Sequence, residues 1–167
     1  MWVTKCICCF LALALTTSAA RAVQKGKNRD ELPDAVLKAI QQNRPGAAIG
    51  KLEVVREEGV TLYDIEFKAG KGEIEVAEDG SVIDIVTIVK IDQIPGAAAA
   101  AILKRAEGAV IKQLQKSEVR AEVKNGKVIK LASLRCVYEA ELVRGTQTTE
   151  IQVAPDGRVI GEPGRTT

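Results

Sequence analysis

The sequence predicts an α+β fold of two tandem repeats, each a helix followed by an antiparallel sheet (α-β-β-β-β), in a pseudo-symmetric arrangement. The first observation behind this prediction is a repeated strand, because residues 63–67 (YDIEF) return as residues 138–142 (YEAEL). The second is a longer repeated segment, because residues 73–83 return as residues 150–160 with the same apolar positions and the same Asp-Gly pair. Self-similarity of this kind indicates one structural unit that occurs twice.

Each unit is expected to begin with a helix. Pro33 and Pro95 each precede an alanine-rich stretch, and proline suits the first turn of a helix because its missing N–H would have no partner there. Pro45-Gly46 then ends the first helix. We place the first repeat at residues 32–91 and the second at residues 92–163.

Antiparallel strands are expected after each helix. In residues 63–67 and 73–76, apolar and charged positions alternate with period two, which is typical of a sheet with one buried and one solvated face. Asp79-Gly80 and Asp156-Gly157 are two-residue hairpin signals, because both turn positions favour positive φ. The sequence therefore predicts that each helix covers one face of a small sheet and leaves the other face to solvent.

The first hairpin of the second unit is longer than its counterpart. Leu52 matches Leu114 at an offset of 62 residues and Tyr63 matches Tyr138 at an offset of 75, so the second unit carries 75 − 62 = 13 extra residues. We expect the tip of this hairpin to project beyond the sheet and to serve as a contact element for a partner. The tip residues are Lys124, Asn125, Gly126 and Lys127.

Residues 1–22 are interpreted as a cleavable signal peptide. Lys5 supplies a positive charge, residues 6–15 are apolar, and residues 20–22 form a small-x-small cleavage site. The apolar run is shorter than the roughly 20 residues that span a bilayer, although an uncleaved N-terminal anchor is the alternative. We therefore expect a periplasmic or secreted protein without stable membrane insertion after cleavage, in which residues 23–31 are a flexible lead-in.

The composition argues against nucleic-acid binding and against catalysis. Removal of Lys5 and Arg21 with the signal leaves 24 − 2 = 22 basic residues against 22 acidic ones, and no basic block is interleaved with aromatic residues. The chain has no histidine, which removes the commonest general base and most zinc ligands. We expect no enzyme activity, no cofactor and no metal site. Cys136 is interpreted as a small core residue, with a reactive or intermolecular thiol as the alternative.

A set of carboxylates on the predicted strands is the remaining candidate site. Strand parity places them on the sheet face opposite the helices, where like charges on neighbouring strands are mildly destabilising. Three interpretations stay open: a face kept charged for solubility, a docking surface for a basic protein or peptide, or a calcium site, although flat strands rarely converge the six to eight oxygens that calcium needs. The set is Asp64, Glu66, Glu73, Glu75, Asp84, Glu139, Glu141 and Glu150.

Several of these segments together resemble a known family. Leu32-Pro33-x-x-Val36, the Pro45-Gly46 helix stop and the strands at residues 63–67 and 75–82 are similar to the PepSY and PepSY-like family of exported bacterial modules. That family shares its helix-plus-sheet unit with the β-lactamase inhibitory protein, which is itself a tandem repeat. The resemblance implies a non-catalytic periplasmic or secreted module, of a kind in which some members are suggested to restrain peptidases.

The resemblance covers the two units unequally. Residues 32–86 match well, whereas residues 94–161 match less well because Glu107-Gly108 replaces the proline-glycine stop and the first hairpin is longer. The function we predict is a non-catalytic exported module that binds a protein or peptide in the cell envelope, with a peptidase or other hydrolase as the partner it would inhibit. The alternatives are a structural or scaffold protein of the envelope and a metal or ligand sensor.

Overall fold

A computed structural model describes residues 22–25 and 31–161 of the chain. Two α-helices, nine strands and the 3-10 turns Lys68–Gly70 and Ile91–Gln93 lie within these ranges. The predicted signal peptide lies outside the described residues apart from Ala22. In chain order the main elements are β1 (Ala22–Lys25), α1 (Asp34–Asn43), β2 (Ile49–Glu57), β3 (Val60–Phe67), β4 (Glu73–Ala77), β5 (Val82–Ile88), α2 (Gly96–Arg105), β6 (Val110–Lys124), β7 (Lys127–Arg144), β8 (Gln147–Val153) and β9 (Val159–Gly161).

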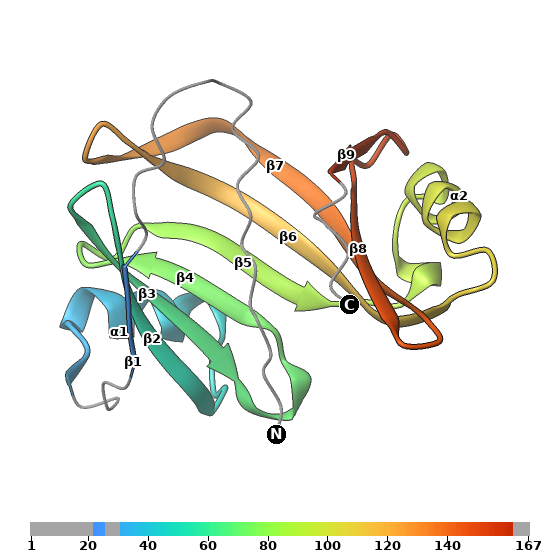
Figure 1. Cartoon of the computed structure of the whole chain (residues 1–167). Coiled ribbons are helices and arrows are strands. Elements are labelled where there is room, and N and C mark those ends of the chain that lie inside the picture. The colour runs from blue at the N-terminus through green and yellow to red at the C-terminus, as the bar shows by residue number, and fades with distance from the viewer. Residues whose placement is uncertain (1–21, 26–30, 162–167) are drawn as a thin grey trace.

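The described strands form one antiparallel sheet in the order β1-β2-β3-β4-β5-β6-β7-β8-β9 (Figure 1). Every strand pairs with the one that follows it in the chain, so the sheet is a continuous meander. β1 pairs with β2 from Ala22↔Arg56 to Lys25↔Glu53. Residues 23–25 of the segment expected to be a flexible lead-in therefore belong to the edge strand β1.

The predicted fold class, α+β with two tandem α-β-β-β-β repeats, is wrong. β5 pairs with β6 from Asp84↔Val119 to Ile88↔Gln115, so the ladder of hydrogen bonds does not divide into two sheets. β6 and β7 contain 15 and 18 residues, and their outer halves pack with strands from the first part of the chain. The described part of the chain is one large antiparallel sheet with two α-helices on it, because the lengthened central hairpin ties both parts of the chain together.

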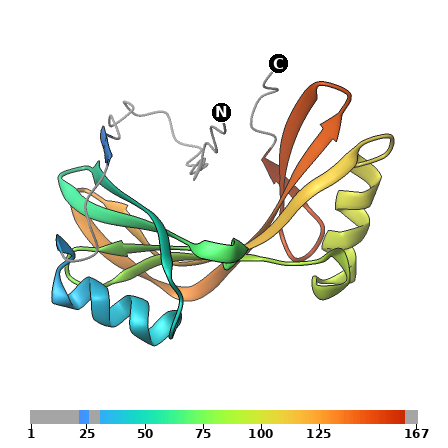
Figure 2. The same ribbon diagram turned by 90° about the horizontal axis from the view of Figure 1, so that it is seen from below.

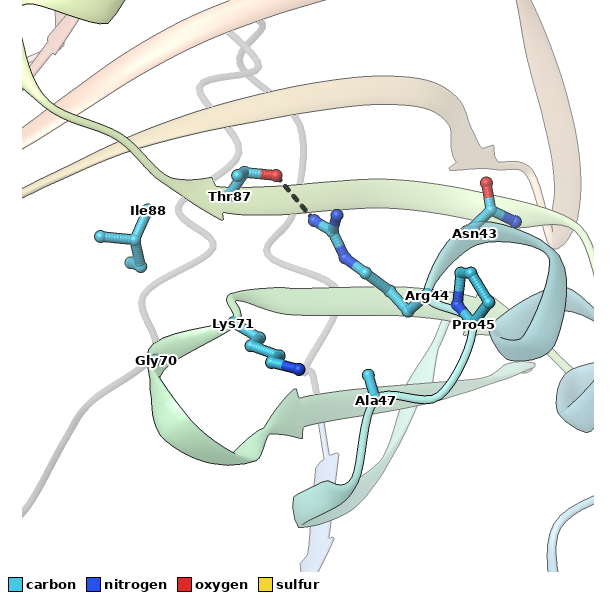
Figure 3. Close-up of a pocket in the computed structure, with 8 residues that line it drawn as sticks. All are labelled: Asn43, Arg44, Pro45, Ala47, Gly70, Lys71, Thr87 and Ile88. Carbon is cyan, nitrogen blue, oxygen red and sulfur yellow. Dashed lines mark hydrogen bonds between the residues drawn. The ribbon is translucent and has the colours of Figure 1, made fainter.

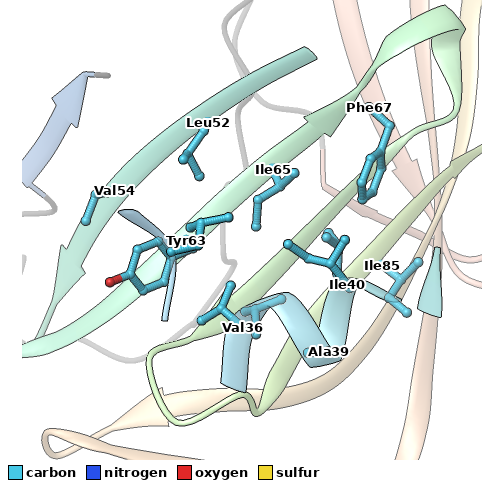
Figure 4. Close-up of a cluster of buried hydrophobic side chains, with 12 residues drawn as sticks. Val36, Ala39, Ile40, Leu52, Val54, Tyr63, Ile65, Phe67 and Ile85 are labelled. Atoms are coloured by element: carbon cyan, nitrogen blue, oxygen red, sulfur yellow. The ribbon is translucent and has the colours of Figure 1, made fainter. Parts of the chain in front are cut away.

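Both helices lie on the convex side of the curved sheet (Figure 2). α1 buries Val36, Ala39 and Ile40 against the strands, and α2 buries Ala98 and Ile102. Figure 4 shows the α1 side chains directed at the sheet, with Leu52, Tyr63, Ile65, Phe67 and Ile85 from β2, β3 and β5 beneath and beside them. Under α2 the sheet contributes Leu114, Tyr138, Ala140, Leu142, Ile151 and Val153.

The predicted hairpin turns form with two different geometries. Asn125 and Gly126 have φ of 52° and 70°, the two left-handed residues that a type I′ turn requires. At Asp79-Gly80 only the glycine is left-handed, with φ 86°, and its N–H donates to the Ala77 carbonyl. The β4–β5 pairing also shifts register beside this turn. It is therefore a bulged loop and not the two-residue hairpin that the sequence predicts.

The concave face of the sheet, opposite the helices, has an apolar cluster of its own. It consists of Val55, Leu62, Ala77, Ile83 and Ala121, with Val60, Val123 and Val128 packed against them. These residues come from the ends of β2 to β5 and from the outer half of the β6–β7 hairpin. We call this region the apolar end of the concave face.

The tip of the β6–β7 hairpin lies against the β2–β3 turn. The Gly126 N–H donates a hydrogen bond to Glu58 Oε2 at 3.1 Å, across 68 positions of the chain. Register shifts in β6 between Ile111 and Gln113 and between Val119 and Ala121 mark bulges, and bulges bend a strand. The tip therefore does not project alone, and the face that was predicted to be solvated is apolar at this end.

Candidate functional site

Many side chains on the rest of the concave face are acidic. They alternate along the strands with the residues that pack under the helices, so they point to the opposite side of the sheet. The directly opposed carboxylate pairs are Glu53–Asp64, Asp64–Glu75, Glu75–Asp84, Glu66–Glu73 and Glu141–Glu150, and Glu53 was not in the predicted set. Opposed positions in an antiparallel sheet have Cβ atoms roughly 4.5–5.5 Å apart. The structure therefore gathers seven of the eight predicted carboxylates into cross-strand groups, and Glu139 lies opposite Gln152.

Glu75 and Asp84 are the most enclosed of these carboxylates, with exposed fractions of 4% and 7%. The Ser117 hydroxyl donates to Asp84 Oδ2 at 2.8 Å, whereas Asp84 Oδ1 is buried without a hydrogen-bond partner among the described residues. Burial raises the pKa of Asp84, and the Ser117 hydrogen bond opposes this shift only in part. Because a buried carboxylate is unfavourable unless it is neutralised, Asp84 favours a proton or a cationic group beside it.

Glu139 is held in position by two glutamines. Gln115 Nε2 donates to Glu139 Oε1 at 3.0 Å, and Gln152 Nε2 donates to Glu139 Oε2 at 2.9 Å. Burial raises the pKa of Glu139, the Gln152 hydrogen bond lowers it, and the negative charges of Glu150 and Glu73 raise it further. The effect of Glu73 on Glu139 connects the acidic groups of β4 and β7 electrostatically.

Two lysines offset part of this negative charge. Lys51 Nζ lies 3.1 Å from Glu53 Oε1, and Lys112 Nζ lies 2.7 Å from Glu141 Oε1. Burial lowers the pKa of Lys51, but the hydrogen bond to Glu53 and the charges of Glu66 and Asp64 raise it by more. Both lysine side chains are more than two-fifths exposed, so solvent screens these ion pairs. The acidic part of the concave face therefore keeps an excess of negative charge.

The acidic residues of β8 and the hairpin tip complete the predicted set. Burial raises the pKa of Glu150, and the charge of Glu141 on the neighbouring strand raises it further. Glu66 is exposed to solvent. The tip residues Lys124 to Lys127 are also exposed, but they lie at the apolar end beside Glu58 and are not brought together with the acidic rows.

Sequence reasoning missed the polar partners and the apolar end. No periodicity distinguishes Ser117, Gln115 and Gln152 from other polar strand residues, so their contacts with Asp84 and Glu139 had no signal. The apolar end did have a signal in the sequence, since Val54-Val55 and Leu62-Tyr63 are pairs of consecutive apolar residues. In a strand, such pairs place apolar side chains on both faces.

The chemistry available at this face is the binding of positive charge. Within residues 22–25 and 31–161, no cluster of three or more potential metal-ligating side chains occurs. In the same part of the chain, no helix is long and apolar enough to cross a membrane.

Cys136, predicted to be a core residue, is half-buried and lies opposite Glu118 on β6.

The fold is similar to several solved structures of Bacteroides proteins. A candidate periplasmic protein of Bacteroides eggerthii matches with a TM-score of 0.58 and 14% identity over 79% of this chain and 88% of the other. A DUF2874 family protein of Bacteroides uniformis matches with a TM-score of 0.55 and 12% identity over 78% and 88%. A BLIP-like protein of Bacteroides fragilis matches with a TM-score of 0.52 and 12% identity over 79% and 85%.

These similarities support a BLIP-like fold, and at such identities they concern the fold alone. No family model matches the chain, and no curated protein matches it. The expected resemblance is therefore supported for its BLIP-like part, whereas membership of the PepSY family is not shown.

Proposed function

We propose that this chain is an exported, non-catalytic binding module whose concave face docks a positively charged segment of a protein in the periplasm or outside the cell. The observation that carries the proposal is the row of opposed carboxylates Asp64, Glu75 and Asp84, two of which are buried. Opposed like charges destabilise a sheet, and burial increases the cost. A partner that places a cationic side chain over this row would relieve both effects on binding.

The apolar end supports a protein or peptide as the partner. The partly exposed residues of the apolar end, Val60, Val123 and Val128, lie on the same face as the acidic rows. A segment that carries a lysine or arginine next to apolar side chains would match both regions. Electrostatic complementarity of this kind chiefly sets specificity and the rate of association.

A secreted hydrolase is the partner class that we propose on the basis of fold. The BLIP-like neighbour supports this choice by analogy, and fold does not by itself imply function. The hydrolase proposal therefore rests on a separate test from the proposal that the concave face binds positive charge.

The test of the binding face is a calorimetric titration of the purified protein with a peptide of alternating lysine and valine residues. The triple variant Glu73→Gln, Glu75→Gln and Glu139→Gln removes three negative charges and keeps the side-chain sizes. We expect it to bind the peptide about tenfold more weakly, a loss of about 1.4 kcal/mol. Its melting temperature should stay equal to that of the parent or rise, because neutralisation relieves repulsion.

A matched control separates the concave face from net charge alone. Glu31→Gln, Asp92→Asn and Glu107→Gln remove the same charge from exposed positions outside the acidic rows, and we expect a loss of less than about threefold. If this control loses as much affinity as the site variant, the concave face is not the binding surface. Failure of the parent protein to bind the peptide would favour the scaffold alternative.

The hydrolase proposal is tested by inhibition assays with purified secreted β-lactamases and peptidases. We expect one enzyme to be inhibited by the parent protein and less by the triple variant. Inhibition that is equal for both proteins would show that another surface acts. Absence of inhibition across the panel would remove the hydrolase proposal and leave the charge-binding proposal to its own test.

A further inference from the structure

A second site lies on the helix side of the sheet, away from the carboxylates. A cavity of about 340 Å3 opens between the C-terminal end of α1, the β3–β4 connection and the end of β5. Ligand pockets commonly begin at roughly 300 Å3, so this volume suits a small molecule. The cavity is lined by Asn43, Arg44, Pro45, Ala47, Gly70, Lys71, Thr87 and Ile88.

The charge of this cavity is positive. Arg44 and Lys71 are its two charged lining residues, and none of the described lining residues is acidic. Neither side chain forms an ion pair with a described residue. Figure 3 shows the two side chains entering the cavity from opposite sides, Arg44 from the end of α1 and Lys71 from the β3–β4 connection. The lining itself therefore carries no negative charge, and the nearby carboxylate that acts on Arg44, that of Glu118, lies outside it.

Arg44 is anchored in a way that leaves hydrogen-bond donors unused. Its Nη2 donates to the Val86 carbonyl at 3.0 Å and to Thr87 Oγ1 at 2.6 Å. Its Nε is buried and has no hydrogen-bond partner in the described part of the chain. A guanidinium has five N–H donors in a planar fork that matches a carboxylate or phosphate group. The bonds to β5 hold this fork in place before any ligand arrives.

Three of the remaining lining residues are apolar, beside the polar Asn43 and Thr87. Pro45 and Ala47 lie on one side, and Ile88, 41% exposed, lies on the other. An exposed isoleucine beside two cationic groups offers contact to the apolar part of a ligand whose charged part is negative. Ile88, Pro45 and Ala47 together offer only a small apolar area. The ligand that fits therefore has one small apolar group attached to its anionic group.

We propose that this cavity binds a small organic anion, with its carboxylate or phosphate group between Arg44 and Lys71 and its apolar group against Pro45, Ala47 and Ile88. The site is independent of the concave face, because Thr87 belongs to the helix side of β5. Carbonyl groups at the C-terminal end of α1 lie beside the cavity and disfavour negative charge. We therefore expect millimolar dissociation constants that increase with salt.

The test is a titration of the isotope-labelled full chain, followed by the backbone amide resonances of Gly70, Lys71 and Thr87. The probes are 3-methylbutanoate, isobutyl phosphate, inorganic phosphate and the neutral 3-methylbutanamide. We expect saturable shifts with both organic anions, with binding of the amide weaker by about tenfold because it lacks the charge. The tighter of the two organic anions identifies the anionic group.

Variants of the two cationic residues decide whether the cavity is the site. Lys71→Gln should weaken binding at least about threefold, whereas Lys68→Gln, an exposed lysine outside the lining, should leave it unchanged. Arg44→Gln should weaken binding further, and Lys71→Gln alone suffices if that variant fails to fold. Equal binding by Lys71→Gln and the parent would overturn the proposal. Binding of inorganic phosphate as tight as that of isobutyl phosphate would overturn the role of the apolar wall.

Discussion

The two faces of this sheet bury apolar surface in different ways. On the convex face, each helix lies across the strands and closes over large side chains such as Ile65, Phe67 and Tyr138. On the concave face no described helix is present, and apolar residues meet because the curved sheet brings the β6–β7 hairpin towards β2 and β3. The same strands therefore use a helix as a cover on one side and their own curvature on the other.

The difference also separates the roles of the two faces. The convex face is apolar under its helices, whereas the concave face combines an apolar end with rows of carboxylates. A face that has to support only folding has no need for buried like charges, since these reduce stability. The comparison indicates that the convex face supplies the larger share of the stability, and the following predictions test that conclusion.

The largest effect is expected for Phe67→Ala on the convex face. Phe67 is 1% exposed and packs in the α1 core, so truncation removes buried surface and leaves a cavity. We expect a loss of about 3–5 kcal/mol in the free energy of unfolding, measured by urea denaturation. Phe67→Leu should lose less. A loss below about 1 kcal/mol for the alanine variant would show that the helix-covered core is not the main source of stability.

A comparable substitution tests the concave face. Leu62 is fully buried in the apolar end, and we expect Leu62→Ala to cost about 2–4 kcal/mol. Ile129 on β7, in the hairpin that covers this cluster, is 46% exposed and provides the control. Ile129→Ala should change the free energy of unfolding by less than about 0.5 kcal/mol. Equal effects of the two substitutions would mean that the hairpin does not close over this end in solution.

The pH dependence of stability tests the acidic rows. Burial raises the pKa of Asp84 in the folded state, so folding favours its protonated form. Its contribution to stability is complete below the pKa of the unfolded chain, about 3.9, and is lost as the pH rises through the folded pKa. Asp84→Asn should therefore melt at the parent temperature near pH 3 and above it at pH 7.

Circular-dichroism melts of both proteins from pH 3 to pH 8 measure this difference. Asn can still accept the Ser117 hydroxyl hydrogen bond through its carbonyl oxygen. A melting temperature that is lower than that of the parent at every pH would contradict the conclusion that the charge of Asp84 is unfavourable.

The smallest effect is expected at the hairpin tip. Glu58→Ala removes the acceptor for the Gly126 N–H, and this exposed hydrogen bond should contribute about 0.5–1 kcal/mol. Glu58→Gln keeps an acceptor oxygen and should behave as the parent. Amide exchange of Gly126 provides a local measurement, and unchanged protection in the alanine variant would show that the tip is held by the apolar cluster instead.

Local features were predictable from the sequence because neighbouring residues determine them. Asn125-Gly126 forms the left-handed turn that this pair favours, and the helix after Pro33 begins where proline places it. Alternation along β3 and β4 placed the apolar residues under α1 correctly. Each of these outcomes depends on contacts within a few positions of the chain.

The overall sheet and the nature of the concave face depend on contacts between distant residues. The repeated motifs suggested two tandem units, each with its own sheet, but pairing of β5 with β6 joins all the described strands into one sheet, and no local pattern reports such pairing. Strand parity treated every residue opposite the helices as solvated. Curvature and the docked hairpin bury Asp84 and Leu62 on that side, and consecutive apolar residues such as Leu62-Tyr63 were the signal that parity alone ignored.

The contact between Gly126 and Glu58 has a consequence for the order in which the molecule folds. The residues that cover Leu62 and Ile83, among them Ala121 and Val128, are synthesised some 40 to 70 positions later than the strands they protect. Until the β6–β7 hairpin arrives, the strands of the first half present apolar side chains on a face with no helix. Exposed strands of this kind aggregate readily. A chain that stops before β6 should therefore depend on chaperones, whereas the complete chain covers this surface itself.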